Sequence, residues 1–218
     1  MNFFGHAIVA SFRSSEPGFI LGAMLPDFAT MIGERVPSVR HQHLETGVAF
    51  HHATDRVFHG SSTFRELETS ARRELRALGV SRPSALAIGH IGVEILIDAR
   101  LTVDDDGVDG YLEALRAGRT LGEHVDWPTT DGRSRWEALR QALVQRGVTR
   151  GAADPGTVTF RVARALSSRP RLRLDSGAEP LVRRWVEDAG PKIADRVPTL
   201  LAEVASGLDV SVRPVHGA

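Results

Sequence analysis

The chain has 218 residues, enough for one domain that buries a sizeable core. Lys+Arg and Asp+Glu both number 27, and this balance argues against a basic nucleic-acid-binding protein. Cysteine is absent from the sequence, which excludes disulfides and thiolate metal sites. Any metal must therefore be bound by histidine and carboxylate side chains.

The sequence favours neither a leader peptide nor a membrane span. The N-terminal segment "MNFFGHAIVASF" has no basic region and contains His6, so it is a poor signal peptide. The most apolar run, residues 85–101, carries His90, Glu94 and Asp98, and is too polar and too short to cross a bilayer. We expect a cytoplasmic protein without stable membrane insertion.

Apolar periodicity predicts a helical protein. Strong patterns predict helices at 2–13, 17–33, 38–58, 63–79 and 82–101. Pro26 is expected to break the second helix, because it disfavours helical geometry at Leu25. A turn is expected at "DDDGVDG" (104–110), which lacks the glycine and glutamate spacing of a calcium loop.

Weaker patterns complete the prediction. They place helices at 109–117, 134–146, 156–166 and 178–206, with a loop at 124–134. No long run alternates with a period of two, so no sheet is predicted. We expect a single all-α domain, with the metal-site core in 1–103 and additional helices in 104–218.

A polar cluster interrupts the apolar face of the helix predicted at 38–58. His51, Asp55 and His59 follow one another at intervals of four residues. At about 100° per residue they share a stripe with Leu44 and Phe58, so they should face inward. Burying an unpaired aspartate would cost several kcal/mol, so this group should be paired or metal-bound.

The helix predicted at 82–101 repeats this spacing with His90, Glu94 and Asp98. Helical bundles build metal sites from a histidine and a carboxylate one turn apart on each of two helices. Such N/O ligands suit Mn²⁺ or Zn²⁺, with Fe or Mg²⁺ as alternatives. His6 and Asp27, both in apolar segments, extend the candidate set. A structural His–carboxylate contact without metal is the alternative interpretation.

Several short motifs together resemble a known family. They are "MNFFGH", "LGAMLPDF", "GVAFHHATD", "RRELRALGV", the "GH" of "AIGHIG", and "SSRPRL". Their order and approximate spacing resemble those of bacterial acyl carrier protein phosphodiesterases, from Met1 to the last long helix. The resemblance implies an HD-domain-like helical bundle with a cation, typically Mn²⁺. That cation activates water to cut the phosphodiester between phosphopantetheine and a carrier-protein serine. The positions that match the family pattern are His6, Asp27, His51, Asp55 and His90.

Three positions depart from the family pattern. His52 replaces an arginine, His59 replaces an aspartate, and Gly89 replaces the aspartate that precedes His90. Glu94, one turn after His90, could compensate for the last of these. The resulting H-x₃-D and H-x₃-E pairs resemble those of zinc-dependent phospholipases C. Zinc, and a substrate other than acyl carrier protein, therefore stay open.

The working hypothesis is a metal-dependent phosphodiesterase. Its expected metal ligands are His6, Asp27, His51, Asp55, His90 and Glu94. The expected general acid is His52 or His59. Phosphate or an acidic carrier surface would be bound by Arg169, Arg171 and Arg173, although a solvated loop would explain these arginines equally well. The alternatives are a phospholipase C-like zinc hydrolase and a non-catalytic helical domain with a structural metal or a buried polar network.

Overall fold

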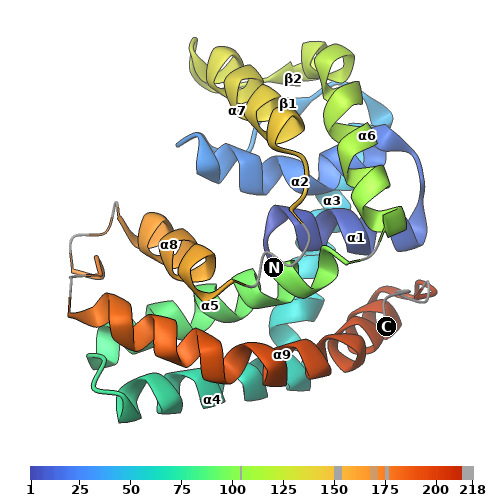
Figure 1. Ribbon diagram of the computed structural model, residues 1–218. Helices are drawn as coiled ribbons and strands as arrows, with labels where there is room; N and C mark the ends of the chain where they lie inside the picture. The colour runs from blue at the N-terminus through green and yellow to red at the C-terminus, as the bar shows by residue number, and fades with distance from the viewer. Residues whose placement is uncertain (104, 150–153, 168, 170, 175–176, 213–218) are drawn as a thin grey trace. The chain divides into compact units, whose positions relative to one another are not determined.

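The computed structural model describes the chain except residues 104, 150–153, 168, 170, 175–176 and 213–218 (Figure 1). The described residues are predominantly helical, which confirms the all-α prediction. The helices are α1 (Phe3–Arg13), α2 (Pro17–Met31), α3 (Gln42–Gly60), α4 (Ser62–Ala77), α5 (Arg82–Leu101), α6 (Asp105–Leu121), η1 (Gly122–His124), α7 (Gly132–Arg146), α8 (Pro155–Leu166) and α9 (Ala178–Leu208). The strands β1 (Ser38–Val39) and β2 (Val125–Asp126) form one antiparallel pair.

The chain divides into two compact units, each built from separate stretches of sequence. Unit 1 contains Met1–Val57, Leu101–Thr149 and Val204–Ala218, and unit 2 contains Phe58–Arg100 and Arg150–Glu203. Helix α3 therefore belongs to unit 1 up to Val57 and to unit 2 from Phe58. The two units alternate along the chain. The metal-site core expected from the sequence, residues 1–103, therefore includes parts of both units.

Unit 1 is organised around α1, α2 and α6, which pack on one another, while α7 packs on α6. Helix α3 approaches α2 unusually closely at two glycines. A Cβ on Gly22 would lie 2.3 Å from the Leu44 carbonyl oxygen, and one on Gly47 would lie 2.3 Å from the Phe19 carbonyl oxygen. Real side chains do not tolerate such distances, so this backbone contact requires glycine at both positions.

Pro26 does not break α2, so that prediction is wrong. The helix runs from Pro17 to Met31 with the proline inside it. Proline removes one helical hydrogen bond, but Leu25, Pro26 and Phe28 are all buried in unit 1. Burial of this apolar helix offsets the lost bond.

The predicted start of the third helix at Ser38 is also wrong. Helix α3 begins at Gln42, because Ser38 and Val39 pair with β2, which lies inside the segment predicted as a loop. Arg40 strengthens this pairing. Its Nε donates to Asp126 Oδ2 over 2.7 Å, and its backbone N–H donates to the His124 carbonyl over 2.9 Å.

The predicted turn at 104–110 is helical from Asp105 onward. The reason lies in the packing of α6 on the first two helices. Tyr111 is buried, with its ring 5.2 Å from that of Phe4, and Gly110 faces Ile20. Contacts that are distant in sequence therefore override the turn-forming composition.

Unit 2 contains α4, α5 and α9, which lie side by side (Figure 1). The ring of Trp185 on α9 packs against Gly92 on α5, where a Cβ would lie 2.7 Å from the indole. The same indole N–H donates to Glu74 on α4 over 3.2 Å. No helix in the described part of the chain is both long and apolar enough to cross a membrane.

Candidate metal centre

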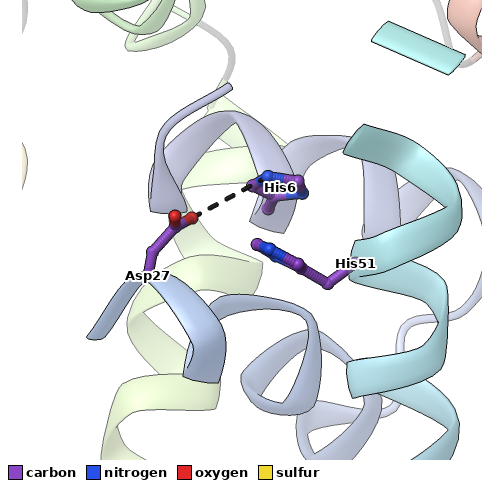
Figure 2. Close-up of side chains that lie close together, drawn as sticks. All are labelled: His6, Asp27 and His51. Carbon is purple, nitrogen blue, oxygen red and sulfur yellow. Dashed lines mark ion pairs between the residues drawn. The ribbon is translucent and has the colours of Figure 1, made fainter. Parts of the chain in front are cut away.

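Unit 1 brings together four of the predicted metal ligands, from three helices. His6 lies on α1, Asp27 on α2, and both His51 and Asp55 on α3. One donor atom from each of His6, Asp27 and His51 lies within 4.8 Å of the others (Figure 2). These four residues are called the unit 1 centre below.

A backbone carbonyl orients the ring of His51. Nδ1 of His51 lies 2.9 Å from the carbonyl oxygen of Ala23 on α2. A carbonyl oxygen only accepts, so Nδ1 carries the proton and donates it. The lone pair of the neutral ring is then on Nε2, which lies 3.5 Å from Asp55 Oδ2. The close approach of α2 and α3 places this carbonyl within reach.

His6 is buried and stacks on His51. The two ring centroids are 3.9 Å apart, with an angle of 29° between the ring planes. Burial lowers the pKa of His6 to about 3, and burial also lowers the pKa of His51. Both rings are therefore neutral at neutral pH, which is the state in which histidine binds a metal.

Two carboxylates face His6. Its Nε2 lies 3.1 Å from Asp55 Oδ1 and 3.8 Å from Asp27 Oδ2. Burial alone would raise the pKa of Asp55, but the contact with His6 and the neighbouring positive groups lower it. Asp55 is therefore ionised at neutral pH, as a metal ligand must be.

The inward stripe predicted for α3 is present, but it is not uniformly buried. His51 is almost fully buried, whereas the side chains of Asp27 and Asp55 are 27% and 36% exposed. The histidines thus form the floor of the unit 1 centre and the carboxylates reach solvent. The oxygens that face His6, Asp27 Oδ2 and Asp55 Oδ1, are themselves buried.

The other predicted residues lie elsewhere. His52 is exposed on α3, with its ring centroid 5.3 Å from that of His51. His59, His90 and Glu94 gather in unit 2. Arg169, Arg171 and Arg173 are exposed residues of unit 2, and Arg173 donates to the Ser167 carbonyl over 3.1 Å.

Sequence reasoning missed the groups that orient the histidines. No side-chain pattern identifies the backbone carbonyl of Ala23 as the partner of His51. Glu68, which contacts His90 in unit 2, forms an i,i+4 pair with Arg72. Such a pair is typical of a solvated helix face and gives no sign of a second partner.

Comparison with known proteins adds no assignment: no family model, curated protein or solved structure matches the chain. The likeness to acyl carrier protein phosphodiesterases therefore remains a prediction from the motifs.

Proposed function

We propose that the chain is a metal-dependent hydrolase of phosphodiesters, with its cation held by the unit 1 centre. The observation that carries the proposal is the orientation of His51. Its Nδ1 proton is committed to the Ala23 carbonyl, so Nε2 directs a lone pair toward the carboxylate of Asp55, 3.5 Å away. The N-terminal ammonium of Met1, 3.7 Å from Asp55 Oδ1, already supplies one positive charge here, and a divalent cation would bind both Nε2 and the carboxylate.

The residues fit a divalent cation better than they fit a proton. His6 and His51 are stacked and both have lowered pKa values, so a shared positive charge on these rings is disfavoured. Nδ1 of His6 is buried without a hydrogen-bond partner among the described residues. Two neutral imidazoles and two carboxylates form an N₂O₂ set that suits Zn²⁺ or Mn²⁺.

Access to solvent supports a catalytic role over a purely structural one. The side chains of Asp27 and Asp55 are partly exposed, although Asp27 Oδ2 and Asp55 Oδ1 are buried, so a substrate oxygen would approach the centre past these carboxylates. The cation, when bound, supplies Lewis-acid chemistry, which stabilises negative charge on a phosphoryl group. His6 and His51 would bind the cation from the buried side of the centre. Asp27 and Asp55 would supply the negative charge beside it.

Proton transfer falls to a neighbouring histidine. His52 is exposed and adjacent to His51, so its imidazole is placed to protonate a leaving alkoxide. Arg169, Arg171 and Arg173 are exposed in unit 2, and their binding of phosphate or an acidic protein surface stays a prediction from the sequence. The motif resemblance makes holo-acyl carrier protein the first substrate to test.

The experiment is a phosphodiesterase assay with purified protein, loaded with Mn²⁺ or Zn²⁺. The substrates are holo-acyl carrier protein, bis(p-nitrophenyl) phosphate and a phosphatidylcholine vesicle. We expect cation-dependent hydrolysis of at least one substrate, abolished in Asp27→Asn, with Asp126→Asn as an exposed control that keeps activity. A metal-loaded protein inactive on all three substrates contradicts the hydrolase proposal.

A further inference from the structure

A second cluster of metal-ligating side chains lies in unit 2. It consists of His59 at the end of α3 with His90 and Glu94, one turn apart on α5. One donor atom from each residue lies within 4.8 Å of the other two. None of these residues belongs to the unit 1 centre, and their arrangement can be argued independently of it.

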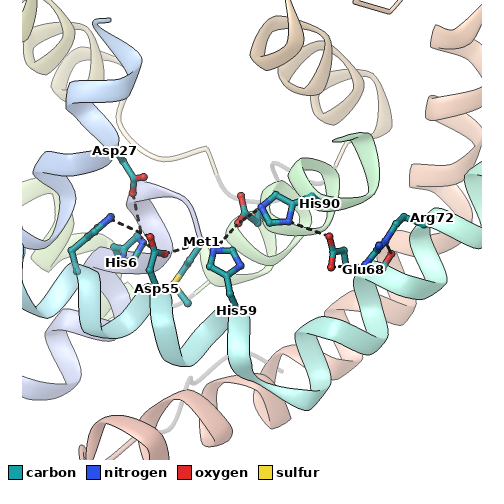
Figure 3. Close-up of polar contacts among 10 residues, drawn as sticks. Met1, His6, Asp27, Asp55, His59, Glu68, Arg72 and His90 are labelled. Atoms are coloured by element: carbon teal, nitrogen blue, oxygen red, sulfur yellow. Dashed lines mark hydrogen bonds and ion pairs between the residues drawn. The ribbon is translucent and has the colours of Figure 1, made fainter. Parts of the chain in front are cut away.

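The ring of His90 is oriented by a carboxylate that is itself held in place. Nδ1 of His90 lies 3.3 Å from Glu68 Oε1, and Arg72 donates to Glu68 Oε2 over 2.7 Å. Figure 3 shows Glu68 between the ring of His90 and the guanidinium of Arg72. A carboxylate accepts, so Nδ1 donates and the lone pair of the neutral ring is on Nε2. Carboxylates orient metal-binding histidines in the same way.

Nε2 of His90 points to Glu94, and so does Nε2 of His59. The two nitrogens lie 3.4 Å and 3.8 Å from the same Glu94 oxygen, Oε1. The two rings stack with centroids 5.2 Å apart and planes only 12° apart. The ring of Phe64 lies nearly perpendicular to both imidazoles, with its centroid 5.2 Å from that of His59 and 5.6 Å from that of His90, which restricts their orientation. Three donor atoms therefore converge from two helices.

Gly89 permits this convergence. A Cβ at this position would lie 3.1 Å from Arg72 Cγ and 3.3 Å from the Arg72 backbone nitrogen. Both distances are tighter than most real contacts, so glycine lets α5 lie close to α4. That approach brings Glu68 to His90. The aspartate expected here from the family resemblance would instead crowd Arg72.

We propose that His59, His90 and Glu94 form a second divalent-cation site of the Zn²⁺ class in unit 2. A proton on one imidazole would satisfy only one of the two contacts with Glu94, whereas a cation binds both nitrogens and the carboxylate together. Three protein ligands leave a coordination position open. The side chains of His59 and His90 are 38% and 39% exposed, so that position is accessible to water or a small anion.

The test is a titration of the full chain with Co²⁺ or Zn²⁺. Equilibrium dialysis measures the number of ions bound per chain. The visible absorption of Co²⁺ monitors its coordination by the side chains. His51→Ala removes the unit 1 centre and isolates the unit 2 site. We expect one ion per chain in this variant, and none after His90→Ala is added. Wild type should bind two ions, and His90→Ala alone should bind one.

Glu68→Gln tests the site without removing a ligand. Loss of the group that orients His90 should raise the Kd of the second ion about 10- to 100-fold. Glu66→Gln is the matched control, because Glu66 lies on the same helix, is exposed and pairs with Arg196 instead. Its Kd should be unchanged. Circular dichroism verifies that each variant folds.

Two results would overturn the second site. One is wild type binding a single ion that His51→Ala abolishes, which would leave the proposed hydrolase intact. The other is a second ion whose Kd is the same in the Glu68→Gln and Glu66→Gln variants. Wild type binding a single ion that His51→Ala retains and His90→Ala abolishes would instead contradict the unit 1 centre.

Discussion

His51 and Ala23 are joined by a hydrogen bond of 2.9 Å from the imidazole Nδ1 to the backbone carbonyl oxygen, which links α3 to α2. This bond directs Nε2 of His51 toward Asp55 and away from the protein backbone. Carbonyl groups often fix the tautomer of metal-binding histidines in this way. A single backbone group thus decides which nitrogen of His51 is available to a ligand.

Substitution of His51 should remove the ion of the unit 1 centre. We expect His51→Ala to lose one ion per chain by elemental analysis after incubation with Mn²⁺ or Zn²⁺ and desalting. His52→Ala is the matched control, because His52 is the next residue on α3 but is exposed. Equal metal content in the two variants would contradict the role of His51.

Removal of the metal should lower the melting temperature. Ligand at a hundredfold excess over Kd stabilises the folded state by about 2.7 kcal/mol. For a chain of this size that corresponds to a shift of about 5–10 °C. We expect a shift of this size on chelation, measured by differential scanning calorimetry, with a smaller shift in His51→Ala. Identical shifts in the two proteins would show that the stabilising ion binds elsewhere.

Acid should destabilise the metal-free protein through His6. The pKa of His6 is about 3 in the folded protein, against an ordinary value of 6.5. As the pH falls below 6.5, the unfolded chain takes up a proton that the folded protein does not accept until about pH 3. The free energy of unfolding therefore decreases across this window. The depressed pKa of Asp55 acts in the same direction.

Replacement of His6 measures this contribution. His6→Gln keeps an amide N–H near Asp55 but cannot titrate, so its free energy of unfolding should depend less on pH. The measurement is urea denaturation in chelator at several pH values between about 7 and 4. Parallel curves for the variant and the wild type would refute the assigned pKa shift.

The glycine contact between α2 and α3 should be essential to the unit 1 centre. In Gly47→Ala the new Cβ would lie 2.3 Å from the Phe19 carbonyl oxygen, so the helices must separate. We expect the free energy of unfolding to fall by about 1–3 kcal/mol. Metal affinity should also weaken, because the Ala23 carbonyl moves away from His51. Urea denaturation and metal titration measure the two effects.

Gly60→Ala is the control for that substitution. Gly60 ends the same helix, and a Cβ there meets no atom within 4 Å. The change should leave stability unaltered or raise it by up to about 1 kcal/mol. Equal destabilisation by the two substitutions would count against a specific role for the glycine contact.

The local pattern of α3 predicted a polar cluster correctly but not its partners. His51, Asp55 and His59 have equal spacing, and the sequence treats them as one group. In the structure the boundary between the units falls after Val57, so His59 gathers with His90 and Glu94. Helical spacing reports which residues share a face, but not which neighbouring helix that face meets.

Errors in the predicted elements have a common cause. Pro26 and the segment 104–110 have the local composition of a helix break and a turn, yet both are helical. In each case apolar packing with distant parts of unit 1 outweighs local propensity. Ser38 and Val39 are extended for a related reason, since their partners in β2 lie far away in sequence.

Anomalous diffraction from crystals grown with Zn²⁺ or Mn²⁺ tests the central claim most directly. We expect an anomalous peak at the unit 1 centre, about 2.0–2.2 Å from nitrogen or oxygen atoms of His6, Asp27, His51 and Asp55. The bond from His51 to Ala23 should be retained. A metal-soaked crystal with no peak there, and with His51 still bonded to Ala23, would contradict the claim.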